Sequence, residues 1–263
     1  MDFTSDLLAL NSRGLFPGPN ENDQNFLGRT QASIPGVTDP KALDLTQKLF
    51  DAAPDWVEVK IGSKGLVPWE GAATWIEENA DGKRTASIQL KSSIPAKLYL
   101  PEEVLAHELV HAMRLGFEED RFEEILAYRT SKNWIRRYCG PLFSKPKEVK
   151  WLLSLMAAAW VSYWIELIFD ANFGGQYLIW MPSVMIGWVG MRLMRAQRTF
   201  STALKNLELA IAKKGKSLAV ALRLTDVEIA LLSRLSPQEI LDYAAKEKGT
   251  SLRWRQLFCA YFK

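Results

Sequence analysis

The pattern of hydrophobic and polar positions divides the N-terminal part of the chain into an irregular arm and a helix. Residues 1–39 are rich in Gly, Pro, Asn and Asp, which predicts an arm with at most a short helix at Asp6–Asn11. Residues 39–53 repeat leucine at helical spacing, after Asp39 as a suitable N-cap and Pro40 in the first turn. We therefore expect the folded domain to begin near residue 40.

The following segments alternate between strand and helix patterns. Residues 56–62 alternate apolar and polar positions as a strand does, and residues 72–93 form two β-prone arms about Asp81-Gly82, which is typical of a hairpin. Residues 100–116 and residues 119–138 show helical spacing, and the second of these helices has a basic end that suits the helix dipole. The pattern predicts a small sheet accompanied by two helices.

Two long apolar runs change the picture in the middle of the chain. Residues 151–169 carry one acidic residue, Glu166, and residues 177–191 carry no charged residue. Each run approaches the length needed to cross a hydrocarbon layer of about 30 Å, and aromatic residues lie near the run ends, as they do at membrane interfaces. We expect a transmembrane helical hairpin over residues 151–194. The alternative is a buried helical hairpin in a soluble protein.

The charges around these runs indicate their orientation. Lysines and arginines flank the runs on both outer sides, whereas residues 170–176 between the runs contain neither. The positive-inside rule then places the parts before and after the hairpin on the cytoplasmic side of a membrane. The basic flanking residues are Arg136, Arg137, Lys145, Lys147 and Lys150 before the first run and Arg192, Arg195 and Arg198 after the second.

Residues 199–263 return to helical patterning and contain no evident chemical constellation. Thr225 with Glu228, and Ser236 with Glu239, form capping boxes that mark two helix starts. We expect an all-α region that serves in packing or interaction.

Composition narrows the partners and the compartment. The formal net charge is only +3, and the basic residues gather around the apolar runs, so the sequence gives no case for a nucleic-acid partner. The two cysteines, Cys139 and Cys259, have no CxxC spacing. They predict free thiols in a reducing compartment.

The candidate chemistry lies in the helix at residues 100–116, which contains both histidines of the chain. His107 and His111 are four positions apart, so both imidazoles lie on one helical face and can bind one metal ion. Neutral imidazole suits zinc, and a catalytic zinc typically takes three protein ligands and a water. Glu108 lies beside the first ligand, where it can take the proton of that water as a general base.

The chain reversal at Gly116 predicts the third ligand. If the helices on either side of it are antiparallel, His111 lies opposite Glu124 and His107 lies opposite Tyr128. Glu124 is therefore the preferred third ligand, and Glu123 is the alternative because a change of crossing angle can shift the register by one residue. Tyr128 either donates to an oxyanion or has an orienting or packing role.

The motif HELVH, followed by Glu124-Ile-Leu-Ala127, resembles the gluzincin metallopeptidases, in which an HExxH helix is completed by Glu in an E-x-x-A context. The resemblance implies that the two histidines and Glu124 bind zinc and that Glu108 is the general base. It also implies a small sheet beneath the active helix, with Thr85–Leu90 as the candidate edge strand that pairs with an extended peptide substrate.

Together these patterns predict an α+β protein of four parts and one enzymatic function. The parts are an irregular arm (1–39), a zincin-like metallopeptidase domain (40–140), a hairpin of two transmembrane helices (151–194) and a helical C-terminal region (199–263). The predicted function is that of a multi-pass, membrane-anchored zinc endopeptidase that hydrolyses protein or peptide substrates. The alternative is a non-catalytic membrane scaffold with a structural or vestigial zinc site.

Overall fold

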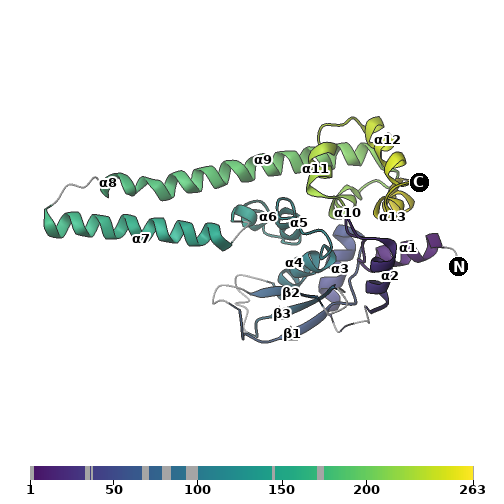
Figure 1. The fold of residues 1–263 in the computed structure, drawn as a ribbon, viewed down its shortest axis with the longest axis horizontal. Coiled ribbons are helices and arrows are strands. Elements are labelled where there is room, and N and C mark those ends of the chain that lie inside the picture. Colours follow the sequence, from purple (N-terminus) through teal and green to yellow (C-terminus); the bar gives the residue numbers. More distant parts are fainter. Residues whose placement is uncertain are drawn as a thin grey trace.

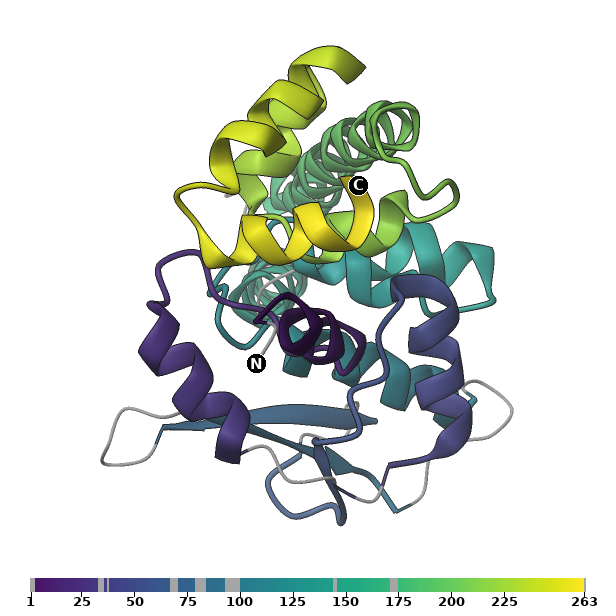
Figure 2. The same ribbon diagram turned by 90° about the vertical axis from the view of Figure 1, so that its right-hand side faces the viewer.

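The chain folds into a mixed α+β structure that is mostly helical and carries a small sheet at one side (Figure 1). The computed structural model describes residues 3–32, 36, 38–66, 71–78, 84–92, 100–143, 146–170 and 175–262. Viewed along the long axis, the sheet forms the lowest layer, α3 and α4 lie above it, and the C-terminal helices cover them (Figure 2). The helix that carries the histidines is therefore enclosed between a sheet and a helical layer.

The sheet contains β1 (Glu58–Ile61), β2 (Ala72–Glu78) and β3 (Arg84–Leu90) in the order β1-β3-β2. The predicted pairing of β2 with β3 is confirmed as antiparallel, and β1 pairs with β3 in parallel. The predicted turn at Asp81-Gly82 lies outside the described residues. The expectation that Thr85–Leu90 forms the edge strand is wrong, because β3 is the central strand. Its alternate residues Ala86 and Ile88 are buried, whereas β2 has no buried residue.

The N-terminal segment is not the irregular arm that its composition predicts. It forms α1 (Phe3–Ser12) and α2 (Asp23–Ala32), and several of its apolar side chains are buried. The apolar residues of this segment are too few and too widely spaced to repeat at helical spacing, so the sequence does not predict that they are buried. Only their tertiary contacts show that they belong to the core. Gln256 donates hydrogen bonds to the carbonyls of Leu7 and Leu15, which connects this segment to the C-terminal helices. The buried residues are Leu7, Leu15, Phe16 and Phe26.

The helices expected at residues 39–53 and 100–116 are confirmed as α3 (Pro40–Phe50) and α4 (Pro101–Met113). Asp39 caps α3, since its carboxylate accepts a hydrogen bond from the backbone N–H of Lys41. Leu105, Ala106 and Leu109 of α4 are buried in a cluster with Ala86 and Ile88 of β3. This packing fixes the histidine-bearing helix on the sheet.

The single helix expected at residues 119–138 is two short helices, α5 (Glu123–Tyr128) and α6 (Trp134–Cys139), followed by a 3-10 turn at Gly140–Leu142. Between the two helices, serine and asparagine side chains make hydrogen bonds that compete with a continuous helical backbone. Ser131 donates to the Glu103 carboxylate, and the Asn133 side chain accepts from the N–H groups of Ile135 and Arg136. The break is therefore set by local capping.

Two long helices, α7 (Pro146–Phe169) and α9 (Trp180–Ala210), project together from the body, joined through the short α8 (Gly175–Leu178) (Figure 1). Among the described helices, only Lys147–Phe169 of α7 is long and apolar enough to cross a membrane by length and composition. The helix α9 has no break between its apolar start and its amphipathic end. The boundary expected near residues 194–199 lies inside this helix, because no helix breaker separates the two patterns there.

The C-terminal helices pack against the back of the histidine helix and so belong to the same core. They are α10 (Ser217–Leu222), α11 (Asp226–Leu232), α12 (Pro237–Glu247) and α13 (Leu252–Leu257), with a last turn at Phe258–Phe262. Phe200, Leu222 and Trp254 lie in one cluster with residues of α4 and α5 such as Met113 and Leu126. Both predicted capping boxes are confirmed at the starts of α11 and α12.

Candidate metal centre

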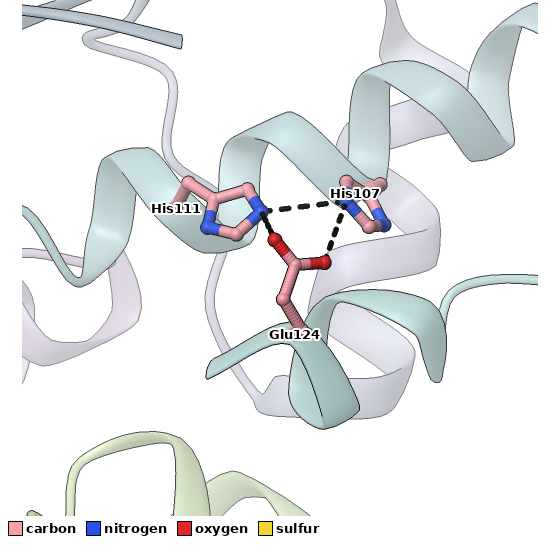
Figure 3. Close-up of side chains that lie close together, drawn as sticks. All are labelled: His107, His111 and Glu124. Atoms are coloured by element: carbon pink, nitrogen blue, oxygen red, sulfur yellow. Dashed lines mark hydrogen bonds and ion pairs between the residues drawn. The ribbon is translucent and has the colours of Figure 1, made fainter. Parts of the chain in front are cut away.

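His107 and His111 on α4 point toward Glu124 on α5 (Figure 3). The Nε2 atoms of the two histidines are 3.3 Å apart. Oε2 of the Glu124 carboxylate lies 3.7 Å from Nε2 of His107, and Oε1 lies 3.6 Å from Nε2 of His111. One ligand atom of each residue lies within 4.8 Å of the others, so this group could hold a metal ion.

The donor set and its spacing fit a tetrahedral metal. Two imidazoles and one carboxylate are a ligand set that zinc takes in catalytic sites. Ligand atoms at about 2.0–2.1 Å from a tetrahedral ion are separated from each other by about 3.3 Å. The distance between the histidine nitrogens equals this value, and the distances to Glu124 exceed it by a few tenths of an ångström. The geometry leaves the identity of the metal open.

Glu123 and Glu124 occupy different sides of His111. Glu123 Oε1 lies 2.7 Å from Nδ1 of His111, on the ring nitrogen that faces away from Glu124. The Nε of Arg114, whose side chain is fully buried, donates to the other oxygen of Glu123 at 3.2 Å. A carboxylate in this position fixes the orientation of a ligating histidine. The structure therefore assigns Glu124 to the ligand group and Glu123 to the support of His111.

The acidic residues give the site a strong preference for a cation. Burial lowers the pKa of His111, but its hydrogen bond to the Glu123 carboxylate and the charges of Glu124, Glu123 and Glu108 outweigh it and raise this pKa to about 9. Burial, charged His111 and Arg136 hold the pKa of His107 well below its usual value. The pKa of Glu124 is raised by burial and by the neighbouring carboxylates, against the attraction of His111. A bound cation would replace the proton on His111 and relieve this repulsion.

The side chain of Glu108 on α4 contacts strand β2. The hydroxyl of Thr74 on β2 donates a hydrogen bond of 2.8 Å to the Glu108 carboxylate and also contacts the Glu108 carbonyl oxygen at 3.1 Å. The strand thus fixes the candidate base beside the candidate ligands. Sequence reasoning missed Thr74, because a threonine in a β-prone segment carries no sign of this long-range contact.

Tyr128 packs against the first histidine. Its ring lies edge-on to the ring of His107 with the centroids 4.6 Å apart. Gly140 lies directly behind it, where a Cβ atom would come within 2.4 Å of two carbons of the tyrosine ring. These contacts support a role in positioning His107. An oxyanion contact of the phenol stays a prediction.

Replacing Gly140 by alanine is expected to weaken metal binding by about tenfold, within the range seen when groups that orient a metal ligand are disturbed. The added methyl group displaces the rigid Tyr128 ring, which in turn moves His107. Competition titration with a chromophoric chelator measures the affinity. Gly190→Ala is the matched control, since a Cβ atom at Gly190 meets nothing within 4 Å. Unchanged metal affinity in a folded Gly140→Ala protein would contradict the positioning role.

Two cavities are lined by residues of the ligand group. One of about 350 Å³ lies between β2 and α4 and is lined by Ile76, His111 and Glu123, among others. The other, of about 430 Å³, lies between α5 and α9 and is lined by Glu124. The candidate centre is therefore bordered by one cavity at the edge strand β2 and by a second cavity at the base of α9.

Comparison with protein-family models, with curated proteins and with solved structures finds no match to this chain. The function is accordingly argued from the geometry of the site itself.

Proposed function

We propose that this protein is a membrane-anchored zinc endopeptidase of the gluzincin type. The observation that carries the proposal is the convergence of His107, His111 and Glu124, with Glu108 held beside them by a strand hydroxyl. Two imidazoles, a carboxylate ligand and an adjacent carboxylate base are the groups that metal-assisted hydrolysis of a peptide bond requires.

The chain's own residues supply the proton transfers of the proposed reaction. A zinc ion, when bound, supplies Lewis-acid chemistry that lowers the pKa of water and polarises a carbonyl group. Glu108 accepts a proton from the water whose oxygen attacks the carbonyl carbon. It then gives that proton to the amide nitrogen as the C–N bond breaks, which yields a carboxylic acid and an amine. Thr74 keeps the Glu108 carboxylate oriented through this cycle.

The substrate is proposed to lie along β2. This strand is an edge of the sheet, and Thr74 in its middle contacts the general base. An extended peptide can pair with the unpaired backbone groups of an edge strand, as in other β-augmented complexes. The placement of the histidine helix on a sheet with an open edge supports the zincin-like fold proposed for this domain, with β2 in the role that the sequence suggested for β3.

The membrane anchor is proposed to consist of α7 and the apolar first half of α9. The exposure of α7 supports this role, since only 6% of its most apolar 18-residue stretch is buried. Arg192 of α9 and Glu148 of α7 form an ion pair at the base of the two helices, with Arg192 Nη2 2.8 Å from Glu148 Oε2. Lysines and arginines gather at this base, while residues 170–176 contain none, which favours a cytoplasmic location for the site under the positive-inside rule.

Removal and return of the metal test the proposed function. The purified protein is expected to contain about one zinc per chain and to cleave a fluorescence-quenched peptide library, as a single catalytic site requires. A chelator is expected to abolish cleavage and added zinc to restore it, because three protein ligands alone hold the ion. Metal content is measured by atomic emission. Cleavage that survives complete removal of zinc would contradict the proposal.

A further inference from the structure

The cavity between α5 and α9 joins the ligand group to the base of the long helices. Its volume is about 430 Å³, and Glu124 lines it together with Asp120, Trp188 and Met191. Cavities of this size lie in the range of about 300–1,000 Å³ that ligand pockets occupy. Since Glu124 belongs to the candidate metal site, the cavity borders that site.

The wall that α9 contributes combines the exposed apolar side chains of Trp188 and Met191 with Arg192 and Arg195. The fractional exposure is 58% for Trp188 and 47% for Met191. The guanidinium of Arg192 lies 5.4 Å from the centre of the Trp188 ring, and its ion pair with Glu148 fixes it there. An indole held in place and a flexible methionine are side chains that bind large apolar groups. Trp188 and Met191 therefore favour an apolar side chain as the occupant of the cavity.

The cavity lies at the level where α9 leaves the body of the protein. Towards its N-terminus the helix exposes apolar residues such as Val184 and Ile186, whereas Ala196 and Phe200 are already buried in the core. Arg195, which also lines the cavity, is exposed and forms no ion pair among the described residues. Along α9, apolar positions are followed by an aromatic and then by basic positions. Transmembrane helices show the same order from the membrane interior to its interface. A polypeptide that leaves the bilayer beside α9 therefore meets the cavity first.

We propose that this cavity binds a large apolar side chain of the substrate, and that the substrate is the segment of a membrane protein directly outside its transmembrane helix. The inference rests on the proposed endopeptidase function and names the substrate class of the same site. It commits to a polypeptide because Glu124, beside which the scissile bond must lie, lines this cavity, while His111 lines a second cavity at the edge strand β2, and an extended chain is long enough to contact both.

Two model substrates and three variants test this assignment. The full chain is placed in vesicles of phosphatidylethanolamine and phosphatidylglycerol. One substrate carries a cleavable segment with leucine and phenylalanine directly after an apolar helix of about 20 residues, long enough to span the bilayer. The other is the same segment as a soluble peptide. The variants are Trp188→Ala, Met191→Ala and, as matched control, Trp160→Ala, which removes a similarly exposed indole of α7 outside the cavity.

The tethered substrate is expected to have a kcat/KM at least about tenfold above that of the soluble peptide, since tethering raises its effective concentration at the cavity. Trp188→Ala is expected to raise KM for the tethered substrate about tenfold, and Met191→Ala somewhat less, with kcat nearly unchanged, because a binding contact away from the scissile bond is lost. Trp160→Ala leaves both constants unchanged. Equal cleavage of the two substrates, or an unchanged KM in Trp188→Ala, overturns the inference while the endopeptidase function stands.

A second readout is independent of turnover. In the Glu108→Gln protein, a photoreactive phenylalanine analogue in the tethered substrate is expected to crosslink within residues 184–195 of α9. If the native chain cleaves neither substrate, the endopeptidase function fails, and the crosslink still decides the cavity. Attachment within that stretch supports substrate binding there, and attachment only elsewhere contradicts it.

Discussion

Replacing Glu108 by glutamine is expected to abolish peptide hydrolysis while zinc binding is retained. The amide has nearly the shape of the carboxylate, and its oxygen can still accept the hydrogen bond from Thr74, so the site keeps its geometry. It cannot accept the proton of the attacking water. Positioned acid–base groups contribute about 10²–10⁴-fold to rates, and a loss of this size in kcat is expected. Steady-state kinetics and zinc content of the same preparation measure both effects.

Glu102→Gln is the control for the loss of charge. Glu102 lies in the first turn of the same helix, away from the ligand group. Its substitution is expected to leave hydrolysis unchanged. Undiminished cleavage in the Glu108→Gln protein would show that another group acts as base. If the native protein binds zinc and cleaves no peptide, the non-catalytic membrane scaffold becomes the better explanation.

The second large effect is expected at Glu228, in the core of the C-terminal helices. Its carboxylate accepts hydrogen bonds of 2.8 Å from each terminal nitrogen of Arg253 and one of 2.6 Å from Trp254. Both charged side chains are nearly inaccessible. Glu228→Gln leaves the arginine without its counter-charge, and removal of one partner of a buried ion pair costs about 3–5 kcal/mol of unfolding free energy. Chemical unfolding of the detergent-solubilised protein, followed by circular dichroism, measures the change.

The same pair predicts how stability depends on pH. Burial raises the pKa of Glu228, but the hydrogen bonds and charge of Arg253, with the Thr225 N–H and Trp254, outweigh it and lower this pKa below its usual value. A carboxylate with a lowered pKa in the folded state stabilises the protein above the pKa of the unfolded chain, about 4.3. That contribution is lost as the pH falls through the folded-state pKa. The stability difference between native protein and Glu228→Gln is therefore expected to be full at pH 7 and to narrow progressively below about pH 4.3.

Glu239→Gln provides the matched comparison. Glu239 closes the capping box of α12 as Glu228 closes that of α11, but it is exposed and pairs with no arginine in the described part of the chain. Only a small loss of stability is expected, since the glutamine can still accept the capping hydrogen bond. Equal effects of the two substitutions would show that capping, and not the buried ion pair, determines the contribution of Glu228.

The local part of the candidate site could be predicted because it depends on helix geometry alone. A spacing of four positions directs His107 and His111 to one face, and a reversal at Gly116 brings Glu124 opposite them. The sequence favoured Glu124 as third ligand but left Glu123 as the alternative, since adjacent residues on a short helix point in different directions, and the structure groups Glu124 with the two histidines. Their directions depend on the helix crossing and on Arg114, which donates to Glu123 and to the carbonyls of Leu222 and Leu224 far along the chain.

The sequence by itself determined those features that short-range periodicity and capping encode. These are the helices α3 and α4, the pairing of β2 with β3, the apolar character of α7, the two capping boxes and the residues that can bind a metal. Such features involve neighbours within about one or two helical turns or one hairpin, so their energies depend on residues that lie together in the sequence.

Only the tertiary structure decided the features that need distant partners. It placed β3 at the centre of the sheet, because β1 pairs with it in parallel from the other side. It made the sparse apolar residues of the N-terminal segment part of the core, and it positioned Thr74 on Glu108 and Glu123 on His111. Burial and long-range hydrogen bonds fix these arrangements. The sequence contains no pattern that pairs these residues with one another, since the partners lie in separate segments that come together only when the chain folds.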